Sequence, residues 1–539
     1  MSAQVQDSPP NGAGNGDSGA AGTGGAARIG LALGPILAIG SLLTPAGPDL
    51  AQEARLVLAL LILMATWWIT EAIPLAVTAL LPIIALPLIG IDVGFDARGR
   101  LACATDGLCH NALAAPLTNE RLLNLGDLGA HYANPVVLLY IGGFLLGIAI
   151  ERWGLSTRMA YTIVARGGAN PKLMLAGFFV AAGFISMWIS NTSTSMILTP
   201  LALAVASGSA AGGRENPRFA AALVLAVAWA ATIGGLATPI GTPPNGIALT
   251  QLRAQGVDVS FGEWMAIGLP VVLVLLPIGW FILSRGLKVD ADGARGAQSR
   301  VRDELDRLGP LTTPEARVAI IFFIFAGLWI ISSLLTEFIS KQILGAAIDN
   351  GHVDTMIATF GALLFFLVPA GGGNRRALLI WEDAQKIPWG ILLLFGGGLA
   401  LAAGAELSGL SRWLANGLEG LADLHPAIVI LTVGLLVIVI TEFASNIATI
   451  SLMGPVLISL GQSSETLGAA AFIVPAAMAA SMGFAMPVGS ASNAIAYGTG
   501  KVRQADMIRK GLLMNLAALI VLTLAGLTIA PMIFGGKTP

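Results

Sequence analysis

The stretch Ile189-Ser190-Asn191-Thr192-Ser193-Thr194 decides how this chain folds, because it places polar residues in the middle of a long apolar run. The run extends from about residue 173 to 206, which is longer than the roughly 20 residues of one membrane span. The pattern recurs at an offset of 255 as Ala444-Ser445-Asn446-Ile447-Ala448-Thr449, within an apolar run near 426–461. Each run therefore predicts a re-entrant helical hairpin with a polar cluster in its middle.

Two further pairs of segments repeat in the same order. Thr238-Pro239-Ile240-Gly241-Thr242-Pro243-Pro244-Asn245 matches Met486-Pro487-Val488-Gly489-Ser490-Ala491-Ser492-Asn493 at an offset of 248. Ile141-Gly142-Gly143-Phe144-Leu145 matches Phe395-Gly396-Gly397-Gly398-Leu399 at an offset of 254. Three ordered matches at nearly one offset indicate internal duplication. Paired helices that are broken near the membrane midplane, one in each half, predict the position of a binding site.

The composition of the 539 residues predicts a polytopic membrane protein. The chain is 55% hydrophobic and only 11% charged, whereas an ordinary soluble chain carries about 25% charged residues. Its net charge of −2 leaves no basic surface for nucleic acid. The apolar runs lie near 29–46, 53–73, 75–92, 136–153, 173–206, 218–252, 264–285, 317–336, 354–370, 388–405, 426–461, 468–500 and 511–534.

We divide the chain by these runs. Its polar, Gly-rich beginning has no periodicity and no pattern of a signal peptide, so we expect a disordered tail followed by a retained first helix. The predicted parts are the tail at 1–28, the first transmembrane helix at 29–50, the first repeat at 51–285, a cytoplasmic linker at 286–316 and the second repeat at 317–539.

The distribution of Lys and Arg predicts the orientation in a plasma (inner) membrane. Most of these residues fall in segments that lie on one side if the N-terminus is cytoplasmic, namely the tail, 152–172, 207–218, 285–317, 371–387 and 501–510. The others are Arg55, Arg98, Arg100, Arg121, Arg253, Lys341, Arg412 and Lys537. This bias satisfies the positive-inside rule. The C-terminus then lies outside, and the two repeats run in opposite directions, which predicts an all-α fold of inverted repeats.

The polar clusters suit ions. A helix that restarts after a break points free N–H groups and a positive dipole end at the gap, which favours an anion. Unwound carbonyls and the Ser and Asn oxygens supply the hard ligands that a cation prefers. The alternative is that these residues only bridge packed helices. Four clusters in two repeated pairs favour ion binding.

Several of these motifs resemble those of one known family, the divalent anion/sodium symporters of the solute carrier 13 type. Ser190-Asn191-Thr192 and Ser445-Asn446-Ile447 resemble its paired Ser-Asn-Thr motifs. Trp68-Ile69-Thr70-Glu71-Ala72-Ile73-Pro74, Gly241-Thr242-Pro243-Pro244-Asn245 and Asn493-Ala494-Ile495 are also similar. The likeness covers roughly 50–534, nearly the whole membrane part.

The resemblance implies a homodimer in which each protomer has a scaffold and a transport domain that moves as an elevator. It also implies two sodium sites and no other cofactor. The first sodium site would use Ser186, Ser190, Asn191 and the carbonyl of Gly241. The second would use Thr441, Ala444, Asn446 and the carbonyl of Gly489. The substrate would lie near Ser190, Asn191, Thr192, Thr242, Ser445, Asn446 and Ser490.

Two departures from the family pattern bear on the substrate. Ile447 stands where the second motif usually has Thr, and Ala491 and Ser492 replace the expected Pro-Pro before Asn493. Ile447 has no hydroxyl to donate, so one end of the anion must be held differently.

Other polar residues in the chain are weighed against these clusters. Glu71 and Glu442 lie in or near apolar runs and are candidates to support the site, against a purely structural hydrogen bond. His110, His131, His352 and His425 fall in connecting segments without zinc-ligand spacing. Cys103 and Cys109 lie in a long polar connection, 93–135, on the predicted outer face, where disulfides persist. We therefore predict that they pair.

The sequence thus predicts a sodium-coupled transporter of a small divalent anion, with a C4-dicarboxylate such as succinate, malate or fumarate as the first choice. Citrate and sulfate symport, sodium-independent exchange and an anion channel remain open. An intramembrane enzyme would need a reactive acid, base or metal beside the clusters. Apart from the two glutamates the sequence offers none, so we assign no catalytic residue.

Overall fold

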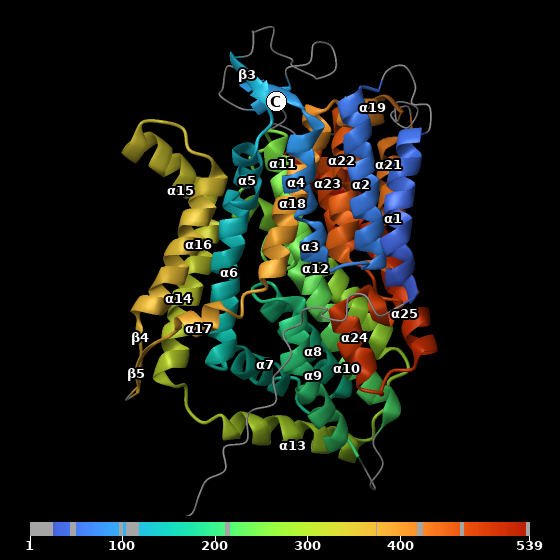
Figure 1. Cartoon of the computed structure of the whole chain (residues 1–539). Helices are drawn as coiled ribbons and strands as arrows, with labels where there is room; N and C mark the ends of the chain where they lie inside the picture. Colours follow the sequence, from blue (N-terminus) through green and yellow to red (C-terminus); the bar gives the residue numbers. More distant parts are fainter. Residues whose placement is uncertain are drawn as a thin grey trace, which may run out of the picture.

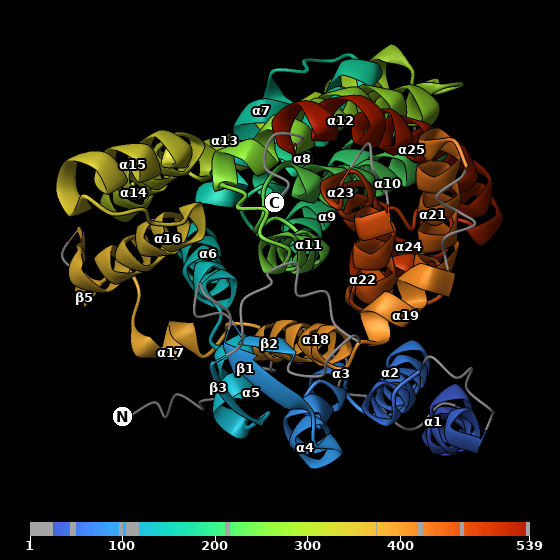
Figure 2. The same ribbon diagram turned by 90° about the horizontal axis from the view of Figure 1, so that it is seen from above.

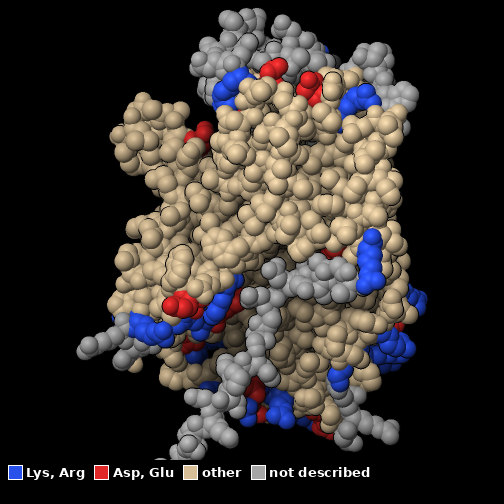
Figure 3. All heavy atoms as spheres, in the orientation of Figure 1, with Lys and Arg blue, Asp and Glu red and all other residues tan. Residues whose placement is uncertain are grey.

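The computed structural model describes residues 25–43, 50–95, 101–103, 118–210, 216–372, 374–417, 424–463 and 468–534. Within them, eight helical segments are long and apolar enough to cross a membrane. They are Gln52–Thr70, Leu125–Arg152, Pro217–Ala237, Phe261–Ser284, Thr313–Ile330, Asn350–Leu367, Trp389–Leu407 and Gln504–Phe534. Charged side chains gather mainly at the two ends of the molecule, and a broad band between them has few (Figure 3). The protein is an integral membrane protein.

The elements are mostly helices (Figure 1). In the first part of the chain they are α1 (Gly25–Leu43), α2 (Gln52–Thr70), α3 (Leu75–Thr78), α4 (Leu81–Ile89), α5 (Leu125–Tyr132), α6 (Pro135–Arg152), α7 (Leu155–Ala165), α8 (Pro171–Ser186), α9 (Asn191–Gly208), α10 (Pro217–Gly234), the 3-10 turn η1 (Gly235–Ala237), α11 (Pro243–Ala254), α12 (Phe261–Ser284) and α13 (Ala291–Arg307).

The second part contains α14 (Thr313–Ile330), α15 (Ser332–Phe338), the π-helical turn η2 (Ile339–Leu344), α16 (Asn350–Leu367), α17 (Trp381–Ala384), α18 (Trp389–Leu407), α19 (Leu410–Gly417), α21 (Pro426–Thr441), α22 (Asn446–Ser463), α23 (Ala470–Ala480), the 3-10 turn η3 (Pro487–Gly489), α24 (Ala491–Gly498) and α25 (Gln504–Phe534). Strands β1 (Asp92–Phe95), β2 (Leu101–Cys103) and β3 (Thr118–Leu122) form one antiparallel sheet in the order β2-β1-β3, and β4 (Pro369–Gly371) pairs with β5 (Asn374–Ala377).

The prediction of an entirely helical fold is wrong at these two sheets. The larger one lies in the connection 93–135, where Val93 pairs with Cys103 and with Arg121. Short strands in a polar connection carry too little apolar alternation to be read from sequence. The first helix begins at Gly25, four residues inside the predicted tail, and residues 1–24 lie outside the described part.

The linker predicted at 286–316 also holds a helix. α13 is capped by Asp290, whose side chain accepts a hydrogen bond from the N–H of Gly293. It buries Ala294, Ala297 and Val301 at helical spacing and contacts α7 and α9. The described parts of 152–172, 207–218, 285–317, 371–387 and 501–510 lie towards the end of the molecule that carries α13, and the sheet β1–β3 lies at the other end (Figure 1). Which end faces the cytoplasm stays a prediction.

Both predicted hairpins and both broken helices are present. α8 and α9 are joined by a short turn after Ser186, and α21 and α22 by one after Thr441. α8 and α9 lie in the lower half of Figure 1, whereas α21 and α22 lie in the upper half. α10 and α11 are interrupted at 235–242, and α23 and α24 at 481–490. α10 is the central helix, and almost all of it is buried.

We predict that Cys103 and Cys109 form a disulfide on the outer face. Cys103 ends β2, and Cys109 lies outside the described residues. Closing so short a loop should stabilise the loop locally, by no more than about 2–3 kcal/mol, so transport should survive Cys103→Ser. Intact cells treated with a membrane-impermeant maleimide should be labelled only after mild reduction. Labelling without reductant excludes the bond, and no labelling after reduction means that the thiols are buried or lie on the opposite face.

Candidate functional site

Four helices begin at the four polar clusters. α9 begins at Asn191, α11 follows Thr242, α22 begins at Asn446 and α24 follows Ser490. The structure brings these starts together, since α9 contacts α24, and α11 contacts both α22 and α23. From above, α9, α11, α22, α23 and α24 lie next to one another beside α10 (Figure 2). Ser190 and Ser490 cap one N–H group each at the starts of α9 and α24, and the other N–H groups of these first turns make the centre attractive to an anion.

Two residues of the first predicted sodium site, Asn191 and Gly241, lie against Gly235. Ser186 Oγ donates to Asn191 Oδ1 at 2.8 Å across the hairpin turn. A methyl group on Gly235 would lie 2.5 Å from Asn191 Oδ1 and 3.0 Å from the carbonyl oxygen of Gly241. The oxygen atoms of Ser186, Asn191 and Gly241 that are predicted to bind sodium thus lie close together. The hydroxyl of Ser190 instead caps α9 by accepting from the N–H of Ser193 at 3.1 Å.

The second predicted sodium site repeats this geometry. Thr441 Oγ1 lies 2.7 Å from Asn446 Oδ1 and donates to the carbonyl of Ala480 at 2.5 Å. Ala444 is buried in the turn between Thr441 and Asn446. Asn446 Oδ1 also lies 3.1 Å from the carbonyl oxygen of Gly489 and 3.2 Å from that of Ala480. With the amide turned over, its nitrogen donates to both carbonyls and to Thr441 Oγ1, whereas in the other orientation its oxygen faces these three oxygen atoms.

Two asparagines that the sequence analysis did not assign hold the broken helices. Asn245 Nδ2 donates to the carbonyls of Gly235 at 3.0 Å and Thr238 at 2.8 Å. At the same offset of 248, Asn493 Nδ2 donates to the carbonyls of Gly483 at 2.7 Å and Met486 at 3.1 Å. Both side chains are fully buried. Each amide bonds carbonyl groups that have lost their helical partners at the break. Such carbonyl groups are costly to leave without a partner in apolar surroundings.

Two glycine pairs allow the backbone to approach itself at each break. A methyl group on Gly241 would lie 2.5 Å from the carbonyl oxygen of Gly235, and one on Gly489 would lie 2.9 Å from that of Gly483. Cβ atoms essentially never come this close to backbone. The two predicted sodium-ligand carbonyls therefore belong to turns that only glycine can form without displacement.

The two candidate glutamates have different surroundings. Glu442 is buried, and its carboxylate accepts from the N–H groups of Ala485 at 2.9 Å and Met486 at 2.8 Å and from Asn515 Nδ2 at 2.5 Å. It holds the segment that leads to Gly489. Glu71 is exposed at the end of α2 in the left-handed conformation, with φ of 48°.

The predicted substrate residues lie at the helix starts. Thr242 is buried, and Ser190, Asn191, Thr192, Ser445, Asn446 and Ser490 are partly buried. Two hydrogen bonds connect the halves here, from Ser492 Oγ to the carbonyl of Asn191 at 3.2 Å, and between Thr242 Oγ1 and Ser481 Oγ at 3.4 Å. Ile447 is partly buried and packs against both hydrophobic clusters of the molecule.

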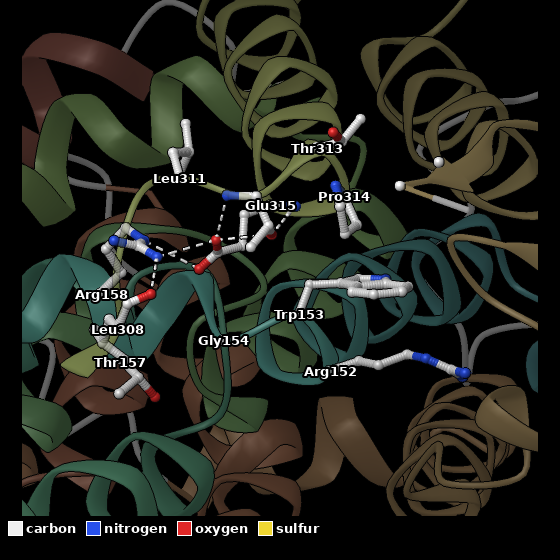
Figure 4. Close-up of a pocket in the computed structure, with 13 residues that line it drawn as sticks. Arg152, Trp153, Gly154, Thr157, Arg158, Leu308, Leu311, Thr313, Pro314 and Glu315 are labelled. Carbon is white, nitrogen blue, oxygen red and sulfur yellow. Dashed lines mark hydrogen bonds and ion pairs between the residues drawn. The ribbon is translucent and has the colours of Figure 1, made fainter. Parts of the chain in front are cut away.

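A cavity of about 770 Å³ lies elsewhere, at the end of the molecule that carries α13. Arg158 crosses it to Glu315, with Nε 3.0 Å from Oε1 and Nη2 3.1 Å from Oε2 (Figure 4). Arg158 also donates to the carbonyl of Gly309 at 2.8 Å. These contacts fasten the end of the linker to α7 and α14. None of the predicted site residues lines this cavity.

Interrupted membrane helices whose ends meet at one polar centre are typical of secondary transporters. The family described as the sodium:sulfate symporter transmembrane region matches residues 30–535, and the chain belongs to it. This confirms the resemblance inferred from the Ser-Asn motifs.

Curated relatives include two proteins named sodium-dependent dicarboxylate transporter SdcS. The one from Staphylococcus saprophyticus is 38% identical over 516 residues, which cover 94% of this chain and 92% of the relative. The one from Staphylococcus aureus strain USA300 is 38% identical over 518 residues, with the same coverage.

Two solved transporter structures share the fold. The Alcanivorax borkumensis YdaH transporter has a TM-score of 0.54 at 15% identity and covers 87% of this chain and 97% of its own. Neisseria gonorrhoeae MtrF, described as one of a class of antimetabolite efflux pumps, has a TM-score of 0.53 at 14% identity, with coverage of 91% and 97%.

Proposed function

We propose that this protein carries a small divalent anion across the plasma membrane by sodium-coupled secondary transport, and that the anion is a C4-dicarboxylate such as succinate, malate or fumarate. The observation that carries the proposal is the repeated oxygen cluster. Asn191 meets Ser186 and Gly241 in one half, and Asn446 meets Thr441 and Gly489 in the other. The SdcS relatives, named as sodium-dependent dicarboxylate transporters, support the same assignment.

Each cluster suits a sodium ion. Hydroxyl, amide and carbonyl oxygens are the hard ligands that such cations prefer. In the second cluster the Asn446 amide has two useful orientations. Without sodium its nitrogen donates to the carbonyls of Ala480 and Gly489. With sodium its oxygen faces the ion together with Thr441 Oγ1 and those carbonyls.

The charge of the anion explains why sodium is needed. The seven proposed substrate residues are all uncharged, so they offer hydroxyl and amide hydrogen bonds but no counter-charge. The helix starts offer only partial charges, whose effect is modest and falls off within the first turn, whereas the two sodium ions would supply two full positive charges. Binding of the anion without sodium would leave its charge poorly compensated in a low-dielectric site.

We further propose that the two halves are inverted repeats and that the protein is an elevator-type homodimer. The hairpins and broken helices, α8–α12 and α21–α25, would move against a scaffold containing α6 and α18. Methyl groups on Gly143 and Gly147 of α6 would lie only 3.0 Å from Ile240 and 3.2 Å from Ile189. The glycines leave this face of α6 without side chains of its own where Ile240 and Ile189 pack against it, and we propose that this smooth face allows sliding.

Uptake into proteoliposomes tests the transport proposal. Labelled succinate should accumulate when a sodium gradient is imposed, and it should not accumulate when choline replaces sodium. Labelled citrate and sulfate in parallel assays identify the alternative substrates. Uptake that is equally fast without sodium, but requires a dicarboxylate inside, would replace symport by exchange. An uptake rate that rises with succinate concentration without saturating would indicate a channel.

We predict that Ile447→Thr changes substrate preference more than stability. The new hydroxyl would stand beside the proposed anion, and a site that hydrogen-bonds a substrate oxygen discriminates strongly. We expect the ratio of succinate to citrate or sulfate uptake to change by about 10-fold or more. Ile447→Val, which shortens the side chain without adding a hydroxyl, is the matched control. An unchanged ratio in Ile447→Thr would show that this position does not contact the substrate.

A further inference from the structure

We propose that two buried hydroxyl groups, those of Ser492 and Ser481, couple the two sodium sites to each other. This inference rests on the proposed function, because it assigns sodium to both clusters. Each hydroxyl lies in the second half of the chain and meets the first half at a residue of the site. Occupancy of one sodium site then favours occupancy of the other.

The first link joins the start of α24 to the start of α9. Ser492 Oγ donates to the backbone carbonyl of Asn191 at 3.2 Å. Ser492 is only 1% exposed. The side chain of Asn191 belongs to the first sodium site, where it accepts from Ser186. A sodium ion that fixes the position of Asn191 therefore also fixes the position of Ser492.

The first turn of α24 connects the position of Ser492 to the second sodium site. Ser492 precedes Asn493, whose side chain donates to the carbonyls of Gly483 and Met486. Ser490 caps the same turn by accepting from the N–H of Asn493 at 3.1 Å. The carbonyl of Gly489 is one residue before this cap. The position of Ser492 thus determines where the Gly489 oxygen points.

The second link joins the two breaks directly. Thr242 Oγ1 and Ser481 Oγ lie 3.4 Å apart, and both side chains are buried. Thr242 follows Gly241, whose carbonyl belongs to the first site. Ser481 follows Ala480, whose carbonyl accepts from Thr441 and faces Asn446 in the second site. This link connects the same two sites through different atoms.

Each link satisfies a buried hydroxyl at a helix end, since Ser492 is the second residue of α24, Thr242 is the N-cap of α11 and Ser481 is the C-cap of α23. Buried hydroxyls in helices usually bond a carbonyl one turn earlier in their own helix. Thr523 does so here, donating to the carbonyl of Leu519 at 2.7 Å. Ser492 reaches a partner 301 positions away, and Thr242 and Ser481 are 239 positions apart. Both links connect ligand-bearing segments of different sites.

Thermodynamic linkage gives the measurable consequence. If the first sodium ion raises the affinity for the second, the second must raise the affinity for the first by the same factor. Uptake should then depend on sodium concentration with a Hill coefficient that approaches 2, the number of coupled sites. Removal of the links should lower this coefficient without removing any sodium ligand.

The test is the initial rate of succinate uptake into proteoliposomes as a function of sodium concentration. We compare the wild type with Ser492→Ala, Ser481→Ala and the double variant. We expect the Hill coefficient to fall towards 1 in the double variant, and the half-saturating sodium concentration to rise about 5-fold, at the lower end of typical coupling factors. The maximal rate at saturating sodium should stay within about twofold. Thr523→Val removes a buried hydroxyl that bonds only its own helix and is the matched control.

The outcomes separate this inference from the proposed function. If succinate uptake by the wild type is independent of sodium concentration, both the proposed function and the coupling are overturned. A sodium-dependent wild type with a Hill coefficient of 1 would overturn the coupling alone, as would a double variant whose coefficient equals that of the wild type. Thermal unfolding without sodium identifies variants that fail to fold. If an alanine variant fails to fold, Ser492→Cys, which is of similar size but has a weaker hydrogen-bond donor, must show the lowered Hill coefficient.

Discussion

Asn191→Ala and Asn446→Ala are each expected to abolish sodium-driven uptake in a protein that still folds. Each amide stands at a hairpin turn, within 2.8 Å of Ser186 or 2.7 Å of Thr441, and next to a glycine carbonyl. Loss of a residue that merely supports a metal ligand costs about 10–100-fold in affinity. Loss of the ligand itself should cost at least about 100-fold in uptake rate at limiting sodium.

The matched control for these variants is Asn170→Ala. Asn170 caps α8 at the far end of the same hairpin, where its side chain accepts from the N–H of Lys172 at 3.0 Å. Its loss should cost about 1 kcal/mol of stability and leave the sodium dependence unchanged. Expression and unfolding temperature are measured for all three proteins. Normal uptake by Asn191→Ala or Asn446→Ala, at normal expression, would remove that asparagine from the site.

Glu442→Ala should have the largest effect on folding. It would leave the N–H groups of Ala485 and Met486 and the amide of Asn515 without their acceptor. A buried donor that loses its partner costs about 1–3 kcal/mol, so the three together should cost roughly 3 kcal/mol or more. We expect the unfolding temperature in detergent to fall and uptake to be lost.

Two further variants define the role of Glu442. Glu442→Gln keeps one acceptor oxygen but turns an NH2 group towards a donor, so it should fold better than Glu442→Ala and still transport poorly. Glu71→Gln changes an exposed glutamate at the end of α2 and should behave as the wild type. A Glu442→Ala protein that unfolds and transports normally would show that the carboxylate does not hold the break before Gly489.

The sequence was informative wherever an apolar run was interrupted. Both hairpins and both broken helices follow from polar residues at membrane depth, where the backbone has few alternatives. The sheet β1–β3 and the helix α13 lie in polar connections, which lack the periodicity that identifies an element. Their formation depends on contacts with the rest of the fold, such as those of α13 with α7 and α9.

The repeat in the sequence identifies the predicted ligand residues. It does not identify the residues that hold them in position. Asn245 and Asn493 stand in the matched segments, yet their bonds to backbone carbonyls depend on the path of the chain through the break. The approach of Gly235 to Gly241 likewise exists only in the folded turn. The links of Ser492 and Ser481 join residues from different halves, so no local pattern predicts them.

The bond between Ser492 and Asn191 has a consequence for how the protein is made. The two residues are 301 positions apart, and a ribosome adds about 5–20 residues per second. Asn191 therefore leaves the ribosome roughly 15–60 s before its partner has been synthesised. During that interval the first hairpin must reside in the membrane, or at the insertion machinery, with its polar turn incomplete. A nascent chain that carries Asn191→Cys and is arrested before residue 490 should accordingly react with a small water-soluble maleimide faster than the finished chain does.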